Sequence, residues 1–191
     1  MTATATAVAT DVRPSASAAT YRIDPAHAGA QFKVRHLMVS NVRGELGEVT
    51  GEVGYDAAAP ERSRVTARID VTAIDTRNAD RDAHLRSADF LDVANHPAIE
   101  FRSTSVRAAG RGALEVEGQL TIRGVTRPVT LEVELSDEVR DPWGNVKRGV
   151  TATARLDRRA FGLTWNAALE TGGVVVGEHV DVTIEAELVR A

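Results

Sequence analysis

Along most of the chain, apolar and polar residues alternate, which is the pattern of β-strands that bury one face. In the clearest case, VTLEVELS at 129–136, each apolar residue is followed by a polar one. The same alternation recurs, strongly or weakly, in 29–36, 65–72, 98–107, 114–123, 148–157 and 180–188. Strands with one apolar and one polar face are typical of antiparallel sheets, so we predict an all-β protein.

Segment 41–55 does not keep a single phase of alternation. Its apolar residues share one parity up to Leu46 and the other parity from Val49 onward, with Gly47 between them. Such a change of phase indicates a β-bulge, where one extra residue bends a strand. We therefore predict one long bent strand over 41–55, of the kind that lets a sheet curl around a barrel.

Turn and helix signals connect these strands. A tight hairpin is predicted with RGVT, residues 123–126, at its tip. Helical character is confined to NADRDAHLRSA at 78–88, where Asn78 suits the N-cap and Asp80 and Asp82 lie near the positive end of the helix dipole. Counted in order, the chain has about eight strands, with this helix between the third and the fourth.

Eight antiparallel strands with one apolar face either close into a barrel or stack as a sandwich. The bent strand and the consecutive hairpins favour an eight-stranded antiparallel barrel. Residues 1–20, rich in Ala, Thr and Ser, are expected to form a disordered tail, which leaves residues 21–191 as the barrel domain. Neither a signal-peptide core of about 7–15 apolar residues nor a membrane-spanning run of about 18 occurs, which predicts a cytoplasmic protein.

The interior of the predicted barrel is short of bulky side chains. Only 4 % of the residues are aromatic, whereas 43 % are hydrophobic. The positions that alternation directs inward are mostly small or β-branched. An eight-stranded barrel is either filled by its own side chains or holds one ligand. Either this barrel is flattened, or a ligand occupies the space.

Strand parity assigns a specific set of residues to the lumen: Phe32, Val34, His36, Ile69, Phe101, Leu120, Ile122, Leu131, Val133, Ala152, Ala154, Val182 and Ile184. Two further aromatic residues, Phe161 and Trp165, adjoin a glycine-rich loop. They are expected near one end of the barrel, either as a plug or as a gate for a ligand. Together these side chains are the predicted ligand-binding residues.

Composition and motifs exclude several classes of function. A net charge of −4 argues against a general nucleic-acid-binding protein, which should be basic. The lack of cysteine excludes disulfides, thiolate zinc sites and cysteine nucleophiles. Phosphate-binding glycine loops, the serine-hydrolase elbow and the zinc-protease motif do not occur either. We predict no catalytic residue, no resident cofactor and no metal.

The histidines leave alternatives open. His36 has the inward parity of its strand, and His27 lies in the turn that precedes the strand. They could be core histidines bound to backbone or carboxylate groups, could hold the polar head of a ligand, or could bind a metal as a pair, although no third ligand is evident. We interpret His84, His96 and His179 as structural.

Six segments, in this order, resemble the YceI-like family of lipocalin-shaped polyisoprenoid-binding proteins: 21–27 (YRIDPAH), 32–36 (FKVRH), 80–91 (DRDAHLRSADFL), 96–101 (HPAIEF), 118–129 (GQLTIRGVTRPV) and 157–163 (DRRAFGL). The resemblance covers about residues 20–190. It implies a lipocalin-like eight-stranded barrel with a helix, which holds a long isoprenoid or related lipid in its lumen. It also implies binding rather than catalysis.

The small inward side chains and the resemblance favour a barrel that stores, carries or shields a long apolar lipid, such as an isoprenoid quinone or a polyprenyl chain. One alternative is an enzyme or stress-response factor in which His36 or His27 acts as acid or base on a substrate in the lumen. Another is a filled barrel that serves as an assembly module through a two-fold homodimer interface.

Overall fold

The computed structural model of the protein describes residues 18–168, 170 and 172–191. Its strands are β1 (Ala19–His36), β2 (Ser40–Glu45), β3 (Val49–Tyr55), β4 (Arg64–Asp70), β5 (Ala98–Gly110), β6 (Ala113–Ile122), β7 (Val125–Leu135), β8 (Val139–Arg140), β9 (Val146–Asp157) and β10 (Val176–Arg190). The helices are α1 (Ala79–Arg86) and two short 3₁₀ helices, η1 (Pro60–Arg62) and η2 (Arg158–Phe161). The predicted tail comprises residues 1–20. Residues 1–17 lie outside the described residues, and β1 begins at Ala19.

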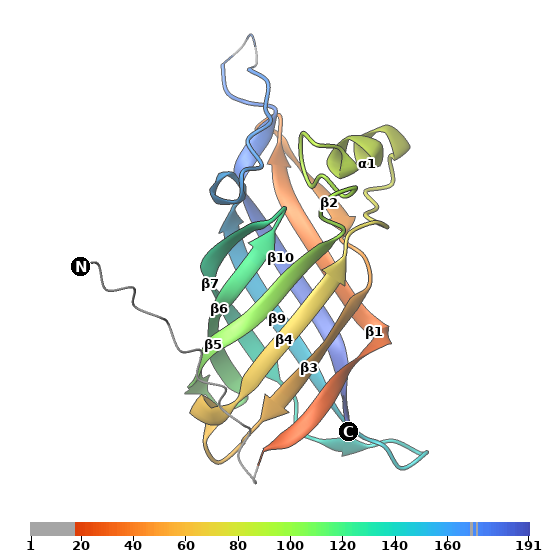
Figure 1. Cartoon of the computed structure of the whole chain (residues 1–191), viewed down its shortest axis with the longest axis vertical. Coiled ribbons are helices and arrows are strands. Elements are labelled where there is room, and N and C mark those ends of the chain that lie inside the picture. The colour runs from red at the N-terminus through yellow and green to blue at the C-terminus, as the bar shows by residue number, and fades with distance from the viewer. Residues whose placement is uncertain (1–17, 169, 171) are drawn as a thin grey trace, which may run out of the picture.

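Eight of the described strands form a closed ring. The order is β10, β1, β3, β4, β5, β6, β7 and β9, every pair is antiparallel, and β9 pairs again with β10. Figure 1 shows the elongated barrel, with α1 at one end. We call this end of the barrel, which also carries η2 and the β6–β7 turn, the upper end. The predicted antiparallel barrel, with its helix between the third and fourth strands of the ring, is confirmed.

The two segments β2 and β3 follow one another along the same edge of β1. β2 pairs with residues 31–36 of β1, and β3 pairs with residues 19–22. The predicted continuous strand with a bulge is wrong, because residues 46–48 between them belong to neither strand. Gly47 explains the break, since its φ is +137° and a Cβ there would lie 1.9 Å from the carbonyl oxygen of Asp70. Only glycine fits such a position.

The β6–β7 hairpin turns on two residues. Arg123 has φ of +50° and Gly124 has φ of +73°. Two successive positive φ values make a type I′ turn, whose twist matches that of the flanking strands. Val125 and Thr126, which we expected in the tip, already belong to β7.

Strand β1 starts ten residues before the predicted segment 29–36. Its pairing with β10 shifts between Ile23 and Ala28, so that DPAH at 24–27 interrupts the ladder without ending the strand. Asp and Pro are residues that favour turns, and Pro cannot donate a ladder hydrogen bond. The sequence therefore indicates a turn where the structure has an irregularity inside a long strand.

Helix α1 is tied to the segment after β4 by a buried carboxylate. Asn78 caps the helix, because its side-chain oxygen accepts from the backbone N–H of Arg81 at 2.9 Å. Asp82 is only 7 % exposed. Its carboxylate accepts from both the backbone N–H and the hydroxyl of Thr76, at 2.8 and 2.6 Å. These bonds fix the helix against the upper end of the barrel.

Replacing Asp82 with alanine should lower the free energy of unfolding by about 1–3 kcal/mol near neutral pH, because two buried donors of Thr76 lose their acceptor. Chemical denaturation measures this difference. Asp80→Ala, on the exposed side of the same turn, is the matched control and should change the free energy by about 0.5 kcal/mol or less. An equal loss in both variants would contradict the anchoring role.

The same carboxylate gives a pH dependence of stability. Hydrogen bonds from Thr76 hold the pKa of Asp82 below its ordinary value. The unfolded chain, with an Asp pKa of about 3.9, therefore binds this proton more readily than the folded chain. The contribution of ionised Asp82 is present above about pH 4 and is lost as the pH falls through the lower pKa of the folded state. The difference between the wild type and Asp82→Ala should shrink in denaturation curves measured at about pH 2.5.

Candidate ligand-binding lumen

A cavity of about 240 Å³ runs inside the barrel. All eight strands of the ring contribute inward side chains to it, and nearly all of these are aliphatic or aromatic. At the upper end it is bounded by Leu85 of α1 and by Phe90 and Leu91 of the loop that follows. Tyr55 and Leu188 line it near the opposite end. The barrel therefore encloses an apolar lumen.

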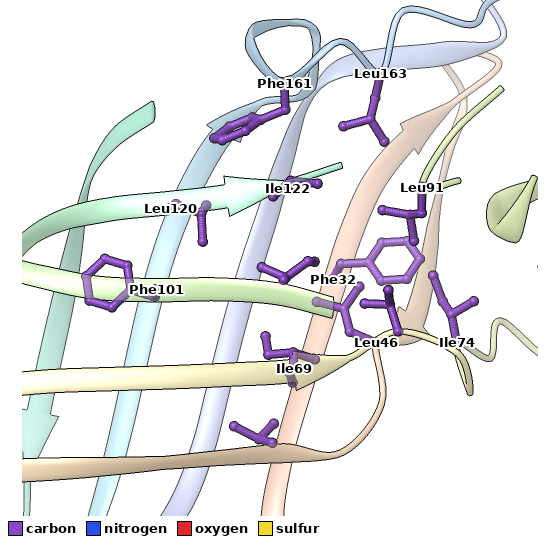
Figure 2. Close-up of a cluster of buried hydrophobic side chains, with 14 of the residues drawn as sticks. Phe32, Leu46, Ile69, Ile74, Leu91, Phe101, Leu120, Ile122, Phe161 and Leu163 are labelled. Atoms are coloured by element: carbon purple, nitrogen blue, oxygen red, sulfur yellow. The ribbon is translucent and has the colours of Figure 1, made fainter. Parts of the chain in front are cut away.

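The wall of this lumen is packed unevenly. Inward side chains of β1, β5 and β6, such as Phe32 and Phe101, are buried. Figure 2 shows that Phe32 lies in a cluster of buried side chains near the upper end. Ala152 of β9 and Val182 and Ile184 of β10 remain half-buried although they face the lumen. Half-buried lining side chains also occur on β3, β4 and β7, for example Val53, Ala67 and Leu131, so the free space extends along several strands, β9 and β10 among them.

Most of the residues predicted from strand parity line this lumen. The structure places there Phe32, Val34, Ile69, Phe101, Leu120, Ile122, Leu131, Val133, Ala152, Ala154, Phe161, Val182 and Ile184. Their contact with a ligand stays a prediction. His36 and Trp165 are not part of the lining.

His36 keeps the parity of Phe32 and Val34, because β1 pairs regularly with β2 from Gln31 to His36 and the shift against β10 places the extra residues on β10. It is the last residue of β1, however, and lies outside the lining of the lumen. His36 is half-buried at the upper rim.

His27 is exposed, in the irregular part of β1. Its Nδ1 lies 2.8 Å from the carboxylate of Asp24. Nine residues separate it from His36 along one strand, which corresponds to roughly 25–30 Å, so the two histidines do not form a pair. The structure instead brings Glu187 to His27 and Asp24, with one ligand atom from each within 4.8 Å of the others. Lys147 offsets part of the negative charge of this group, because its Nζ lies 2.7 Å from Glu187 and 3.8 Å from Asp24.

Aromatic rings gather over the upper end of the lumen. The ring of Trp165 packs edge-on against His84 at 4.7 Å between centroids and lies 5.3 Å from Phe90. His84 also contacts Phe90 and bonds to Asp89 at 3.0 Å. The ring cluster joins α1 to the segment after η2, so Trp165 covers the lumen from outside its lining.

Among the lining residues that sequence reasoning missed, Arg158 is the charged one. It opens η2, is only 6 % exposed, and lines the lumen at its upper end. Burial lowers the pKa of its guanidinium. The sequence DRR at 157–159 reads as a solvated charge cluster, and nothing in its pattern singles out the middle residue. Only the turn into η2 directs Arg158 inward.

The wall of the barrel is open between the upper parts of β7 and β9. These strands pair only from Glu132 to Leu135 of β7, and the upper half of β7 pairs with β6 alone. A groove of about 650 Å³ lies beside the unpaired segments, lined among others by Pro128 of β7. Leu156 and Phe161 line both this groove and the lumen. Phe161 therefore separates the lumen from the outside at this gap.

Comparison with known proteins identifies the family. A model of the YceI-like domain matches residues 21–188. The chain belongs to the YceI-like family. A UPF0312 protein of Ectopseudomonas mendocina is 40 % identical over 151 residues, covering 78 % of this chain and 79 % of that protein. One from Shewanella baltica is 36 % identical over 178 residues, covering 92 % and 90 %.

Solved structures agree with the YceI-like fold. BcnA of Burkholderia cenocepacia superposes with a TM-score of 0.75 at 19 % identity, covering 86 % of this chain and 98 % of that one. A YceI protein of Campylobacter jejuni gives 0.69 at 24 %, covering 82 % and 89 %. A domain from Saccharophagus degradans, described as polyisoprenoid-binding, gives 0.62 at 14 %, covering 90 % and 98 %. At these identities the likeness shows the lipocalin-like barrel alone. No helix among the described residues is long and apolar enough to cross a membrane.

Proposed function

We propose that this YceI-like protein binds one long apolar lipid in its lumen, such as an isoprenoid quinone or a polyprenyl chain, and stores, carries or shields it without catalysing a reaction. The observation that carries this proposal is the unfilled apolar lumen inside the barrel. The polyisoprenoid-binding description of the Saccharophagus degradans domain supports it. Each methylene group buried there contributes about 0.8 kcal/mol.

The size of the lumen favours a narrow ligand. Its volume of about 240 Å³ lies just below the range of about 300–1,000 Å³ that is common for ligand pockets. A single extended chain fits such a space better than a fused-ring or two-chain lipid. The open wall between β7 and β9 offers a route of entry, with Phe161 as the side chain that has to move.

The enzyme alternative has less support than binding. Within the described part of the chain, the lumen lining contains no histidine and no carboxylate, so neither His36 nor His27 can act on a molecule held inside it. General acid–base catalysis needs such a group within hydrogen-bond reach of the substrate. The unfilled lumen also weakens the hypothesis of a filled assembly module. A homodimer and a cytoplasmic location stay predictions from the sequence.

The direct test is the lipid that the protein carries. Full-length protein purified from its native source without detergent should release about one lipid per chain on solvent extraction, identified by mass spectrometry. Delipidated protein should then rebind that lipid in a titration. A chain that yields no lipid, together with a delipidated protein that rebinds no polyprenyl alcohol, would overturn the proposal. His36→Ala should leave rebinding unchanged, because His36 lies outside the lining.

A further inference from the structure

The turn between β1 and β2 presents three consecutive apolar side chains to solvent. Leu37, Met38 and Val39 are 38, 50 and 75 % exposed. They lie at the upper end of the barrel, where β1 ends (Figure 1). Scattered exposed apolar residues are normal on a protein surface, but a contiguous group can mark an interaction site. This turn is therefore a candidate for contact with another surface.

The backbone of this turn is poorly suited to the residues that form it. Leu37 and Met38 have φ of +50° and +61°. The N–H of Val39 donates to the carbonyl of His36 at 3.1 Å and closes the turn. Successive positive φ values favour Asn, Asp or Gly, because a larger side chain crowds the backbone there. Leucine and methionine thus occupy these positions at a steric cost, which points to a use for their side chains.

Basic side chains flank the apolar turn. Nη2 of Arg35 donates to the carbonyl of Met38 at 2.8 Å, so this exposed guanidinium lies beside the turn. Arg43, also exposed, is the cross-strand partner of Lys33, and like charges in that arrangement are unfavourable. Lys33 pairs with Asp181 at 3.0 Å, whereas neither arginine is in an ion pair with an acid of the described chain. The turn therefore carries local positive charge in a protein whose net charge is −4.

A second segment packs against the turn. The N–H of Leu37 donates to the carbonyl of Val175 at 2.8 Å. Residues 173–175 are a glycine and two half-exposed valines, so the segment adds small and apolar groups beside the turn. One exposed acid, Glu170, precedes this segment in the same loop, against two arginines that flank the turn. The end of the barrel is thus apolar at the turn and basic around it.

We propose that the turn at 37–39 docks this protein on a lipid bilayer that contains anionic phospholipids. The three apolar side chains enter the boundary between head groups and acyl chains, and Arg35 and Arg43 contact the lipid phosphates. The inference stands on this surface alone and does not depend on a ligand in the lumen. It adds a partner to the proposed function, because it brings the upper end of the barrel, with the opening between β7 and β9, to a membrane.

A second copy of this chain fits the turn less well than a bilayer does. A stable protein–protein interface takes about 800 Å² and roughly 20–30 residues from each partner, far more than a three-residue turn offers. A two-fold contact through the turn would also bring together the arginines of both copies. A bilayer with anionic head groups instead supplies both the apolar region and the opposite charge.

The exposed apolar residues at the opposite end of the barrel fit a bilayer less well than the turn does. Val139 and Trp143 lie on the hairpin before β9, which starts at that end. Asp137 and Asp141 flank them. Anionic lipids would repel these carboxylates, so the charges favour the β1–β2 turn as the docking surface.

Vesicle binding by the full-length protein tests this inference. The probes are vesicles of phosphatidylcholine alone and vesicles of an equal mixture of phosphatidylcholine and phosphatidylglycerol. Sedimentation gives a partition coefficient for each. The mixed vesicles should bind the protein at least about tenfold more tightly. Salt at about 1 M should remove this difference, because it screens the charges.

Variants assign the binding to the turn. Leu37→Asn combined with Met38→Gly removes two apolar side chains and supplies residues that suit positive φ. This double variant should bind mixed vesicles at least about tenfold more weakly, yet unfold at no lower a temperature than the wild type. Arg43→Gln should weaken that binding about fivefold, and adding Arg35→Gln should make the two vesicle types equal. Trp143→Ser, which removes an exposed side chain at the opposite end, is the matched control and should bind like the wild type.

Several results would overturn the docking proposal. They are the absence of binding to either kind of vesicle, equal binding by the wild type and the Leu37→Asn, Met38→Gly variant, and loss of binding in Trp143→Ser. A dimer in analytical ultracentrifugation that this double variant dissociates, without vesicle binding, would make a second copy the occupant of the turn. Titration with farnesol should give the same affinity for the double variant and the wild type, so failure of docking leaves the proposed function intact.

Discussion

Replacing Ala152 with phenylalanine should weaken the binding of a long-chain lipid by roughly 100-fold. Ala152 lies on β9, faces the lumen, and pairs across the sheet with Val133 and Ile184, so a ring at this position enters the free space. If the ring displaces about four methylene groups of the ligand, about 3 kcal/mol of binding free energy is lost, at about 0.8 kcal/mol each. A loss of about 1.4 kcal/mol is tenfold.

The same substitution should not destabilise the fold, because the ring fills space that no side chain occupies. Titration of the delipidated protein with farnesol gives the change in affinity, and thermal denaturation gives the stability. Thr153→Phe is the matched control, since Thr153 is the next residue on β9, lies outside the lining, and should leave the affinity unchanged. Unchanged binding in Ala152→Phe would mean that the ligand lies elsewhere.

Phe161→Ala should lower the free energy of unfolding by about 3–5 kcal/mol, as loss of a buried phenylalanine does. Phe161 is only 2 % exposed and lies on η2 between the lumen and the groove outside the gap. If the ring is also a gate, the variant should release bound lipid several-fold faster. If Phe161 is only a plug, the variant should lose stability without releasing lipid faster. This variant therefore decides between the two roles that the sequence left open.

Stopped-flow displacement of a fluorescent lipid measures the rate of release, and denaturation measures the stability. Leu163→Ala is the matched control, because Leu163 is buried and lines the lumen but does not line the groove. It should lose stability without faster release. Equal acceleration in both variants would indicate general loosening of the upper end rather than a gate at Phe161.

The alternation of residues was enough to predict the barrel, because each strand buries one face and the period of two then fixes which side chains share it. This is why Leu120, Val133 and Ile184 could be assigned to the lumen from the sequence alone. The method fails wherever the pairing register shifts. At 24–27 such a shift lies hidden behind turn-forming residues. At His36 the alternation of β1 continues, but parity does not reveal that the end of the strand lies beyond the lumen lining.

Arg158 could not be found in this way, because its direction depends on a 3₁₀ turn and on carbonyls that come from η2, the following loop and β10. Those contacts join residues that are close in space but follow no period along the chain. The gap between β7 and β9 has the same origin. It depends on how far two strands remain paired, which the residues of either strand alone do not reveal.

The unpaired upper half of β7 also exposes the barrel to a hazard that closed sheets avoid. A free strand edge can template the addition of another chain and so start aggregation. Arg127 and Pro128 stand on this edge, both exposed, where one brings a charge and the other lacks the N–H group that an incoming strand would need. Arg127 and Pro128 thus make the unpaired edge beside the groove a poor template for a second β-strand.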